Sequence, residues 1–231
     1  PLMFVLLFAY VFGGAIDVPG GSYREYLLGG ILVQSISFGM MGPATAIATD
    51  LTEGVIDRFR SLPSSSTSYL LGHYIAEFAG MCLAVVVLLS AGLVVGWRAH
   101  AGVVDFACAV LLVLAFASAM IWFGTYVGLM VRSPDAVQGV AFVVMFPLSF
   151  LSNAFVPIET MPSVLQAFAR WNPISVLVAA VRHLFGNPVA PLSRSSWPLD
   201  HPVLAGYLYC AVLLAIAVPG TIRRYRARTT D

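Results

Sequence analysis

The sequence predicts an all-α integral membrane protein with six transmembrane helices. It also predicts a short amphipathic helix on the cytoplasmic side and a re-entrant helical hairpin on the outer side before the last span. Of the 231 residues, 59% are hydrophobic and only 10% are charged, whereas soluble domains carry about 25% charged residues. The apolar residues form continuous runs of the length that a membrane helix needs, not the alternating pattern of a membrane β-barrel.

Six apolar segments are expected to be helical, and together they form one transmembrane domain over residues 1–231. They cover residues 2–16, 27–48, 74–97, 103–131, 137–156 and 203–222. The first is the shortest: at 1.5 Å per residue it spans only about 22 Å of helix. We therefore expect an N-terminal cytoplasmic or interfacial segment to be missing before Pro1.

Arginine placement predicts the orientation, because loops on the cytoplasmic side carry an excess of positive charge. With the C-terminal tail in the cytoplasm, six crossings place residues 49–73 and 132–136 on the same side as the tail. That side then holds seven of the twelve arginines and the outer side holds five. The expected location is the inner membrane of a bacterial cell, with a cytoplasmic C-terminus.

The outer segment before the last span, residues 157–186, contains two short apolar helical patterns. One begins at Pro162 and stops before Asn172 and Pro173; the other covers about 174–185 and ends at Gly186, a residue favoured just after a helix. Both are too short to cross a bilayer and too apolar for a free loop. They predict a re-entrant or interfacial hairpin.

The segment TDLTEGVIDRFRSLP is rich in charged residues, lies between two apolar segments and predicts a helix over residues 50–62. Asp50 and Glu53 have the spacing of a capping box. On a helical wheel, the apolar residues, among them Leu51, Val55 and Phe59, share one stripe. The opposite face holds Glu53, Asp57 and Arg60, and Arg58 lies at the edge of the apolar stripe. A membrane-surface helix usually has a basic polar face, so the mixed charge favours a protein partner over a helix that only rests on lipid headgroups.

The composition excludes several kinds of chemistry. The chain has no lysine, so it cannot hold a P-loop of the Walker type, which needs one to contact the phosphates of ATP. We find no catalytic or metal-binding constellation and expect no cofactor in this chain. The net charge of +1 gives no indication of nucleic-acid binding, and an ionisable residue at the centre of a span, typical of ion-coupled carriers, is absent.

Polar and aromatic residues within two spans are open to two interpretations. Small and polar residues commonly hold membrane helices together, and that is the majority interpretation. The alternative is a path for a hydrophobic molecule between the second and fifth spans. Its candidate residues are Gln34, Ser37, Met41, Phe146, Phe150 and Asn153.

Several stretches, in their order along nearly the whole chain, resemble the type-2 ATP-binding-cassette (ABC) exporter permeases, and most closely the daunorubicin and multidrug-resistance group. They are LFAYVFGGAI, GILVQSISFG, DLTEGVIDRFRSLPSSS and the long run GLMVRSPDAVQGVAFVVMFPLSFLSNAFVPIETMPSVLQAFARWNPIS. The resemblance implies two permease subunits, identical or paralogous, that pair in the bilayer. It also implies separate nucleotide-binding ATPase subunits, which hold the ATP and Mg²⁺.

The resemblance further implies roles for particular positions. The 50–62 helix would be a coupling helix that contacts the ATPase, and the second and fifth spans would line the substrate path. The outer hairpin would form a gate near Glu159 and Trp171. The candidate coupling residues are Asp50, Glu53, Gly54, Asp57, Arg58, Phe59 and Arg60.

These inferences predict the membrane subunit of an ATP-driven exporter that moves hydrophobic or amphiphilic compounds, such as drugs, antibiotics or lipids, by alternating access. The hydrolysis of ATP is assigned to the partner, so this chain is not itself an enzyme. Two alternatives stay open at this point. One is a carrier driven by an ion gradient, and the other is a membrane scaffold that transports nothing.

Overall fold

The computed structural model describes residues 2–7, 10, 22–55, 66–131, 133–189 and 196–228, and these residues form helices and connecting turns, with no strand among them. Side chains are described for all of these except residues 2, 4, 66, 67 and 228. The elements in chain order are α1 (Leu2–Leu7), α2 (Tyr23–Gly39), α3 (Met41–Thr52), α5 (Ser66–Val95), α6 (Val103–Met130), α7 (Pro134–Phe150), the 3-10 helix η2 (Ile158–Thr160), α8 (Ser163–Trp171), α9 (Pro173–Phe185), α10 (Trp197–Asp200) and α11 (Pro202–Arg228).

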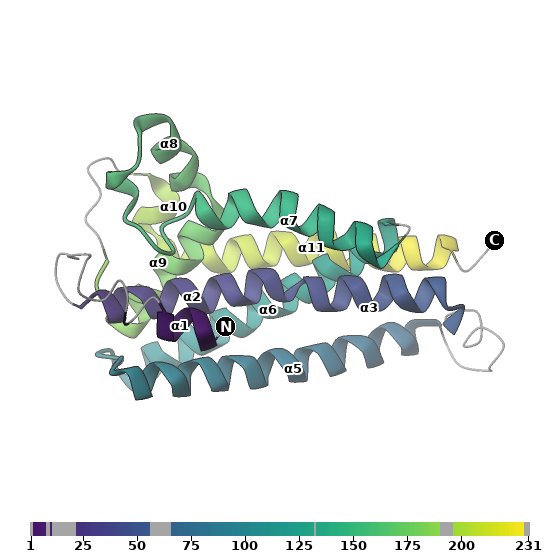
Figure 1. Cartoon of the computed structure of the whole chain (residues 1–231), viewed down its shortest axis with the longest axis horizontal. Helices are drawn as coiled ribbons and strands as arrows, with labels where there is room; N and C mark the ends of the chain where they lie inside the picture. The colour runs from purple at the N-terminus through teal and green to yellow at the C-terminus, as the bar shows by residue number, and fades with distance from the viewer. Residues whose placement is uncertain are drawn as a thin grey trace.

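The long helices run roughly parallel to one another, and α8, α9 and α10 gather at one end of the bundle (Figure 1). The opposite end holds the end of α3, the start of α5 and the C-terminal end of α11. Residues near 52, 66 and 228 therefore share one end, as the predicted topology requires. We call the end with α8–α10 the outer end, following the orientation predicted from the arginines.

Helices α2 and α3 form the centre of the bundle. Together they make a 30-residue apolar segment from Tyr23 to Thr52 that is mostly buried, whereas α5 and α11 expose most of their apolar surface.

Helix α6 packs closely against α3 through Gly124 and Gly128. A side chain at position 124 would collide with the backbone of Met40, between α2 and α3, and one at position 128 with the backbone of Ala44 in α3. The two glycines therefore have the small-residue spacing that allows membrane helices to pack closely.

The predicted spans are confirmed in part. Four helices are long and apolar enough to cross a membrane, and a fifth crossing is possible if α8 and α9, which are bent by 70° at Asn172, count as one broken span. The expected count of six is not confirmed. Of the first expected span, residues 2–7 and 10 are described, and the rest lies outside the described residues.

The fifth span differs from its expected range of 137–156. Helix α7 begins earlier, at Pro134, where Ser133 accepts a hydrogen bond from the amide of Ala136, and it ends at Phe150. Its 17 residues reach only about 26 Å at 1.5 Å per residue. Pro147 lies in its last turn, where the missing N–H favours the end of a helix.

The two helices of the outer segment are confirmed as helices, although their re-entrance into a membrane stays a prediction. Helix α8 starts directly after Pro162. Helix α9 has Pro173 at its first position, and the Asn172 side chain accepts a hydrogen bond from the amide of Ile174. Gly186 ends α9 with a φ of 66°, the left-handed conformation that glycine adopts without strain.

The helix expected to begin at Asp50 does not begin there. Helix α3 continues through Asp50 to Thr52, and the amide of Glu53 donates to the carbonyl of Thr49 as the helix ends. Gly54 follows with a φ of 69°. The capping-box prediction for Asp50 and Glu53 is therefore wrong, because packing against α6 extends the second span by one more turn. Residues 56–62 of the predicted coupling helix lie outside the described residues.

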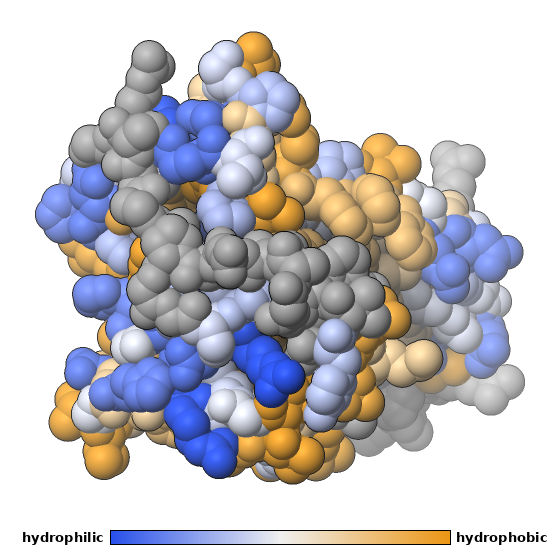
Figure 2. Space-filling view, turned by 60° about the vertical axis from the view of Figure 1, so that its left-hand side comes forward, coloured by the Kyte–Doolittle hydropathy of each residue, from blue (hydrophilic) through white to orange (hydrophobic). Residues whose placement is uncertain are grey.

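The surface agrees with a membrane environment. Figure 2 turns the outer end toward the viewer and shows hydrophilic residues gathered on that end, with apolar residues along the flanks behind it. Ile75, Leu83 and Val94 on α5 and Ile216 on α11 are large apolar side chains that are mostly exposed. Such a surface is stable in lipid, where apolar side chains need no cover from water.

Candidate substrate path and outer gate

Arg182 on α9 is the most unusual residue of the outer end. Its side chain is only 1% exposed, and its guanidinium donates three hydrogen bonds to main-chain carbonyls. Nε donates to Tyr26 at 2.7 Å, Nη1 to Asn153 at 2.9 Å and Nη2 to Ala154 at 2.9 Å. We call these four residues the Arg182 clasp. It joins α9 to α2 and to the turn after α7.

Tyr26 completes the clasp with its side chain. The guanidinium carbon of Arg182 lies 3.4 Å from the centroid of the Tyr26 ring, within the range of a cation–π contact. The Tyr26 hydroxyl donates to the same Asn153 carbonyl at 3.0 Å. Buried arginines usually pair with an acid, but no carboxylate of the described residues forms an ion pair with Arg182. Carbonyl dipoles and a ring face hold this cation instead.

The carbonyls of Asn153 and Ala154 are available because the chain is not helical there. Helix α7 ends at Phe150 and η2 begins at Ile158, so these carbonyls have no helical partner. The amide of Asn153 donates to the Ser175 hydroxyl at 3.2 Å. Gly30 allows the turn after α7 to pack closely against α2, because a side chain at position 30 would collide with the Ala154 carbonyl.

Asn172, at the bend between α8 and α9, fixes the same turn from the other side. Its Nδ2 donates to the carbonyls of Leu148 at 2.6 Å and Leu151 at 3.0 Å. These bonds occupy carbonyls at the end of α7 that would otherwise have no helical donor. The outer end of the fifth span is therefore connected to α9 through Asn172 and Arg182, and to α2 through Tyr26.

Sequence reasoning counted Arg182 only among the outer arginines and missed its role. The available signal was its position in ISVLVAAVRHLF, a helix whose other residues up to Val181 are apolar or small. A charged residue within such a helix needs a buried partner or a functional reason. The partners themselves lie 28 to 156 residues away in the chain, and no local pattern indicates them.

The predicted path residues fall into two groups. Phe146 and Phe150 lie on an open face of α7, each about half exposed, with ring centroids 4.3 Å apart. Gln34 and Ser37 on α2 are buried; Ser37 donates to the carbonyl of Val33, and Gln34 Oε1 has no hydrogen-bond partner among the described residues. Met41 is half-buried against the core. The structure therefore brings the two phenylalanines together but does not place Gln34 and Ser37 of α2 or Met41 of α3 on the same open surface.

The two predicted gate residues make different contacts at the outer end. Glu159 in η2 forms an ion pair with Arg170 of α8, with 3.5 Å between carboxylate oxygen and Nη2. Trp171 is 63% exposed, and its carbonyl accepts a hydrogen bond from Tyr209 of α11 at 3.3 Å. Glu159 therefore links η2 to α8 at the outer end, while the Trp171 side chain is exposed.

The predicted coupling residues are described only up to Gly54. Asp50 accepts a hydrogen bond from the hydroxyl of Tyr69 on α5, and the Tyr69 ring stacks on Tyr225 of α11 at 5.9 Å. Glu53 is exposed beyond this contact. Asp57, Arg58, Phe59 and Arg60 lie outside the described residues. The end of α3 is thus connected to two other spans just before the charged segment begins.

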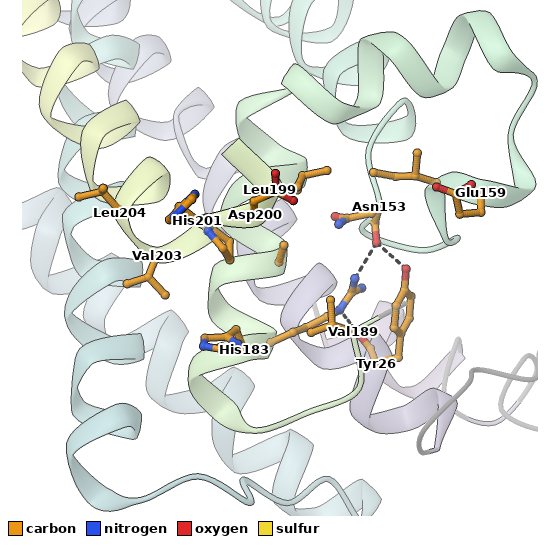
Figure 3. Close-up of a pocket in the computed structure, with 14 residues that line it drawn as sticks. Tyr26, Asn153, Glu159, His183, Val189, Leu199, Asp200, His201, Val203 and Leu204 are labelled. Atoms are coloured by element: carbon orange, nitrogen blue, oxygen red, sulfur yellow. Dashed lines mark hydrogen bonds between the residues drawn. The ribbon is translucent and has the colours of Figure 1, made fainter. Parts of the chain in front are cut away.

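A pocket of about 440 Å³ lies beside the Arg182 clasp, between η2, α9, α10 and the start of α11 (Figure 3). Its lining mixes apolar side chains with polar and charged ones. The polar lining residues are Tyr26, Asn153, Glu159, Arg182, His183, Asp200 and His201. No group of three acidic, histidine or cysteine side chains in the described part of the chain could hold a metal ion.

A mostly buried central span, long helices with exposed apolar surfaces and the short helices α8–α10 at the outer end define a multi-pass membrane protein. The sequence pattern of the family described as ABC-2 type transporter matches residues 1–185. The chain belongs to this family, which consists of membrane subunits of ABC transporters. This confirms the family that the resemblance indicated.

Three individual relatives are permease proteins, in agreement with the family match. The chain is 32% identical to a daunorubicin resistance ABC transporter permease protein of Streptomyces coeruleorubidus, over 98% of this chain and 77% of that protein. It is 29% identical to a doxorubicin resistance ABC transporter permease protein of Mycobacterium tuberculosis, over 89% of this chain and 71% of that protein. An inner membrane transport permease of Escherichia coli is 23% identical over 93% of this chain and 85% of its own length.

Proposed function

We propose that this chain is the transmembrane subunit of an ATP-driven exporter for hydrophobic or amphiphilic compounds. The observation that carries the proposal is the family match together with 32% identity to a daunorubicin resistance permease over nearly the whole chain. The chain lacks lysine, so a P-loop must lie on another polypeptide. The partners are a nucleotide-binding subunit, which binds ATP and Mg²⁺, and a second permease subunit.

In this mechanism the outer ends of the second and fifth spans separate when the path opens outward. The Arg182 clasp holds α2, α9 and the turn after α7 together at the outer end in the described conformation, so this separation must break or rearrange its contacts. The connection between Asp50 and Tyr69 supports a route from the charged segment 53–60 into α5 and α11. The end of α3 and the C-terminus face the cytoplasm of a bacterial cell, where the ATPase docks.

The open face of α7 with Phe146 and Phe150 is the part of the path that contacts the compound. Rings at this spacing offer a large apolar surface with few directional groups, which suits hydrophobic compounds of varied shape. Gln34, Ser37 and Met41 join this surface only when α2 and α7 move apart.

Reconstitution tests the proposal. The chain and its cognate nucleotide-binding subunit are placed in proteoliposomes, and ATP-dependent uptake of daunorubicin, the compound in the relative's name, is measured in inside-out vesicles. Uptake that needs ATP and both subunits is expected. Transport by the chain alone under a proton gradient, without ATP, would refute the assignment.

The coupling segment is tested in the same system. Glu53→Gln and Arg60→Gln are each expected to reduce compound-stimulated ATP hydrolysis several-fold, because the docking face loses charge. Arg194→Gln, on the predicted outer side, is the control. If both coupling variants assemble and hydrolyse ATP as the original chain does, residues 50–62 are not the coupling element.

A further inference from the structure

The pocket beside the Arg182 clasp is lined by Asn153, which the sequence predicted as a residue of the substrate path. The Asn153 side chain is 8% exposed, and its Oδ1 has no hydrogen-bond partner among the described residues. Figure 3 shows this side chain pointing away from the clasp, toward the wall formed by Leu199, Asp200 and His201. Only the main-chain carbonyl of Asn153 belongs to the clasp.

A buried acceptor without a donor destabilises the protein, because it has lost its hydrogen bonds to water. Such a group persists where a ligand supplies the donor or where a functional reason keeps it. Because Asn153 lines a pocket of about 440 Å³, the donor can come from a bound molecule.

The charges around the pocket select the kind of donor. Arg182 places a buried positive charge on one wall, which repels an ammonium head. Glu159 and Asp200 place carboxylates on the same lining, which repel a phosphate or sulfate head. A neutral head with hydroxyl groups avoids both penalties, and each hydroxyl both donates and accepts. His183 and His201 add further hydrogen-bonding groups.

The pocket reaches the exposed surface of α11 at Leu204. Leu204 lines the pocket and is 62% exposed, and Leu208, Val212 and Ile216 follow at four-residue intervals, all exposed. Residues four apart lie on one helix face, so these side chains form a continuous apolar stripe. Val212 and Ile216 also border a second pocket of about 200 Å³ between α6, α9 and α11, whose lining is almost entirely apolar.

The distance between the two pockets suits one molecule. From Leu204 to Val212 the helix rises about 12 Å, at 1.5 Å per residue, which is close to the length of a ten-carbon alkyl chain. A head in the first pocket therefore allows an apolar body to lie along α11 and end in the second.

We propose that the pocket between η2, α9, α10 and α11 binds the neutral, hydroxyl-bearing head of an amphiphile, with Asn153 accepting from a hydroxyl, and that the apolar body lies along Leu204, Leu208 and Val212. Identifying this amphiphile with the exported compound rests on the proposed function, whereas the binding itself does not.

The test uses the full chain in its complex with the ATPase, in lipid nanodiscs and without ATP. The probe is decyl glucoside with a photoreactive diazirine at the end of its alkyl chain, and labelled peptides are mapped. Labelling is expected in residues 209–216 of α11. An excess of decyl glucoside should suppress it, whereas decyl sulfate and decyltrimethylammonium at equal concentration should not.

Three variants locate the head. Asn153→Leu removes the amide and should weaken labelling about tenfold, the factor that corresponds to one hydrogen bond in a buried site. Asn153→Asp keeps an acceptor oxygen and should retain labelling. Leu204→Trp fills the rim and should block labelling without touching the clasp. The melting temperature of each complex is measured in parallel to show that it is folded.

The experiments distinguish a failure of the proposed binding site from a failure of the exporter assignment. Labelling that survives both Asn153→Leu and Leu204→Trp, or that decyl sulfate suppresses equally well, would overturn the proposed site. If ATP-dependent export is absent but labelling follows the expected pattern, the exporter assignment fails and the binding site stands. If export occurs but α11 is not labelled, the site fails and the exporter assignment stands.

Discussion

The guanidinium of Arg182 lies 3.4 Å above the ring of Tyr26 and also donates to the carbonyl of that same residue at 2.7 Å. One side chain on α9 therefore contacts both the backbone and the ring of one residue on α2. With the bonds to Asn153 and Ala154, three segments that are distant in sequence meet at a single buried cation. This arrangement makes the outer end of the bundle a rigid unit in the described conformation.

Replacing Arg182 tests how much this contact stabilises the bundle. Arg182→Met removes three buried hydrogen bonds, although the Asn153 carbonyl keeps its bond from the Tyr26 hydroxyl. We expect a loss of about 2 kcal/mol, or about 5 °C in Tm for a chain of this size. Arg182→Lys keeps the charge but lacks the planar guanidinium, so its Tm should lie between the Tm of Arg182→Met and the Tm of the original chain. Thermal unfolding of the purified complex in nanodiscs measures both.

Arg223→Met is the matched control, because Arg223 is exposed near the end of α11 and its loss should leave Tm unchanged. If Arg182→Met and Arg223→Met melt at the temperature of the original chain, the clasp contributes nothing to stability.

Gly30→Ala tests the close approach between α2 and the turn after α7. The new methyl group would meet the Ala154 carbonyl, so the turn must move and the clasp must lengthen. We expect Tm to fall by several degrees, even though alanine favours a helix by about 1 kcal/mol over glycine. Gly80→Ala on α5 is the control, since nothing lies within 4 Å of its new methyl group, and its Tm should stay level or rise.

Three of the long helices, the ends of two short ones and the family could be predicted from the sequence. Helices α5, α6 and α11 were predictable because lipid demands long apolar helices whose backbone groups are satisfied internally. The ends of α8 and α9 were predictable from Pro162, Asn172 and Gly186, whose effects are local. The family was predictable from motifs spread along the chain.

Other features depend on contacts that no local pattern specifies. The capping-box spacing of Asp50 and Glu53 indicated a helix start, yet packing of α3 against α6 carries the helix past Asp50. The end of α7 at Phe150 was missed because hydropathy continues to Val156. The environment of Arg182 could not be predicted, since its three partners belong to other segments.

Tyr69→Phe tests the connection between α3 and the neighbouring spans. The substitution removes the hydroxyl that donates to Asp50 but keeps the ring that stacks on Tyr225. A hydrogen bond to a charged acceptor contributes about 1.5 to 3 kcal/mol, so the end of α3 should become less rigidly attached to α5. We expect the complex to assemble normally while compound-stimulated ATP hydrolysis falls at least about threefold.

Tyr74→Phe is the control for Tyr69→Phe. Tyr74 lies five residues further along α5 and shares a hydrogen bond of 2.9 Å with Ser118 on α6, away from the end of α3. Its loss should leave stimulated hydrolysis near the original value. Equal effects of the two variants would show that the Asp50 contact has no special part in coupling.

Phe146→Ala tests the apolar face of α7 as a contact surface for the compound. Phe146 is 49% exposed and stacks on Phe150 with 4.3 Å between ring centroids. Stacked aromatic pairs contribute about 0.5 to 1.5 kcal/mol beyond their buried area, and a compound that inserts beside the pair gains comparable contacts. We expect the concentration for half-maximal ATP-dependent uptake of daunorubicin to rise about three- to tenfold, with a Tm change of less than about 2 °C because the ring is already half exposed. Leu83→Ala on α5 removes an apolar side chain that is 65% exposed on another helix, and it should change neither quantity. If Phe146→Ala leaves uptake unchanged, or if Leu83→Ala impairs it to the same degree, the compound does not pass along this face of α7.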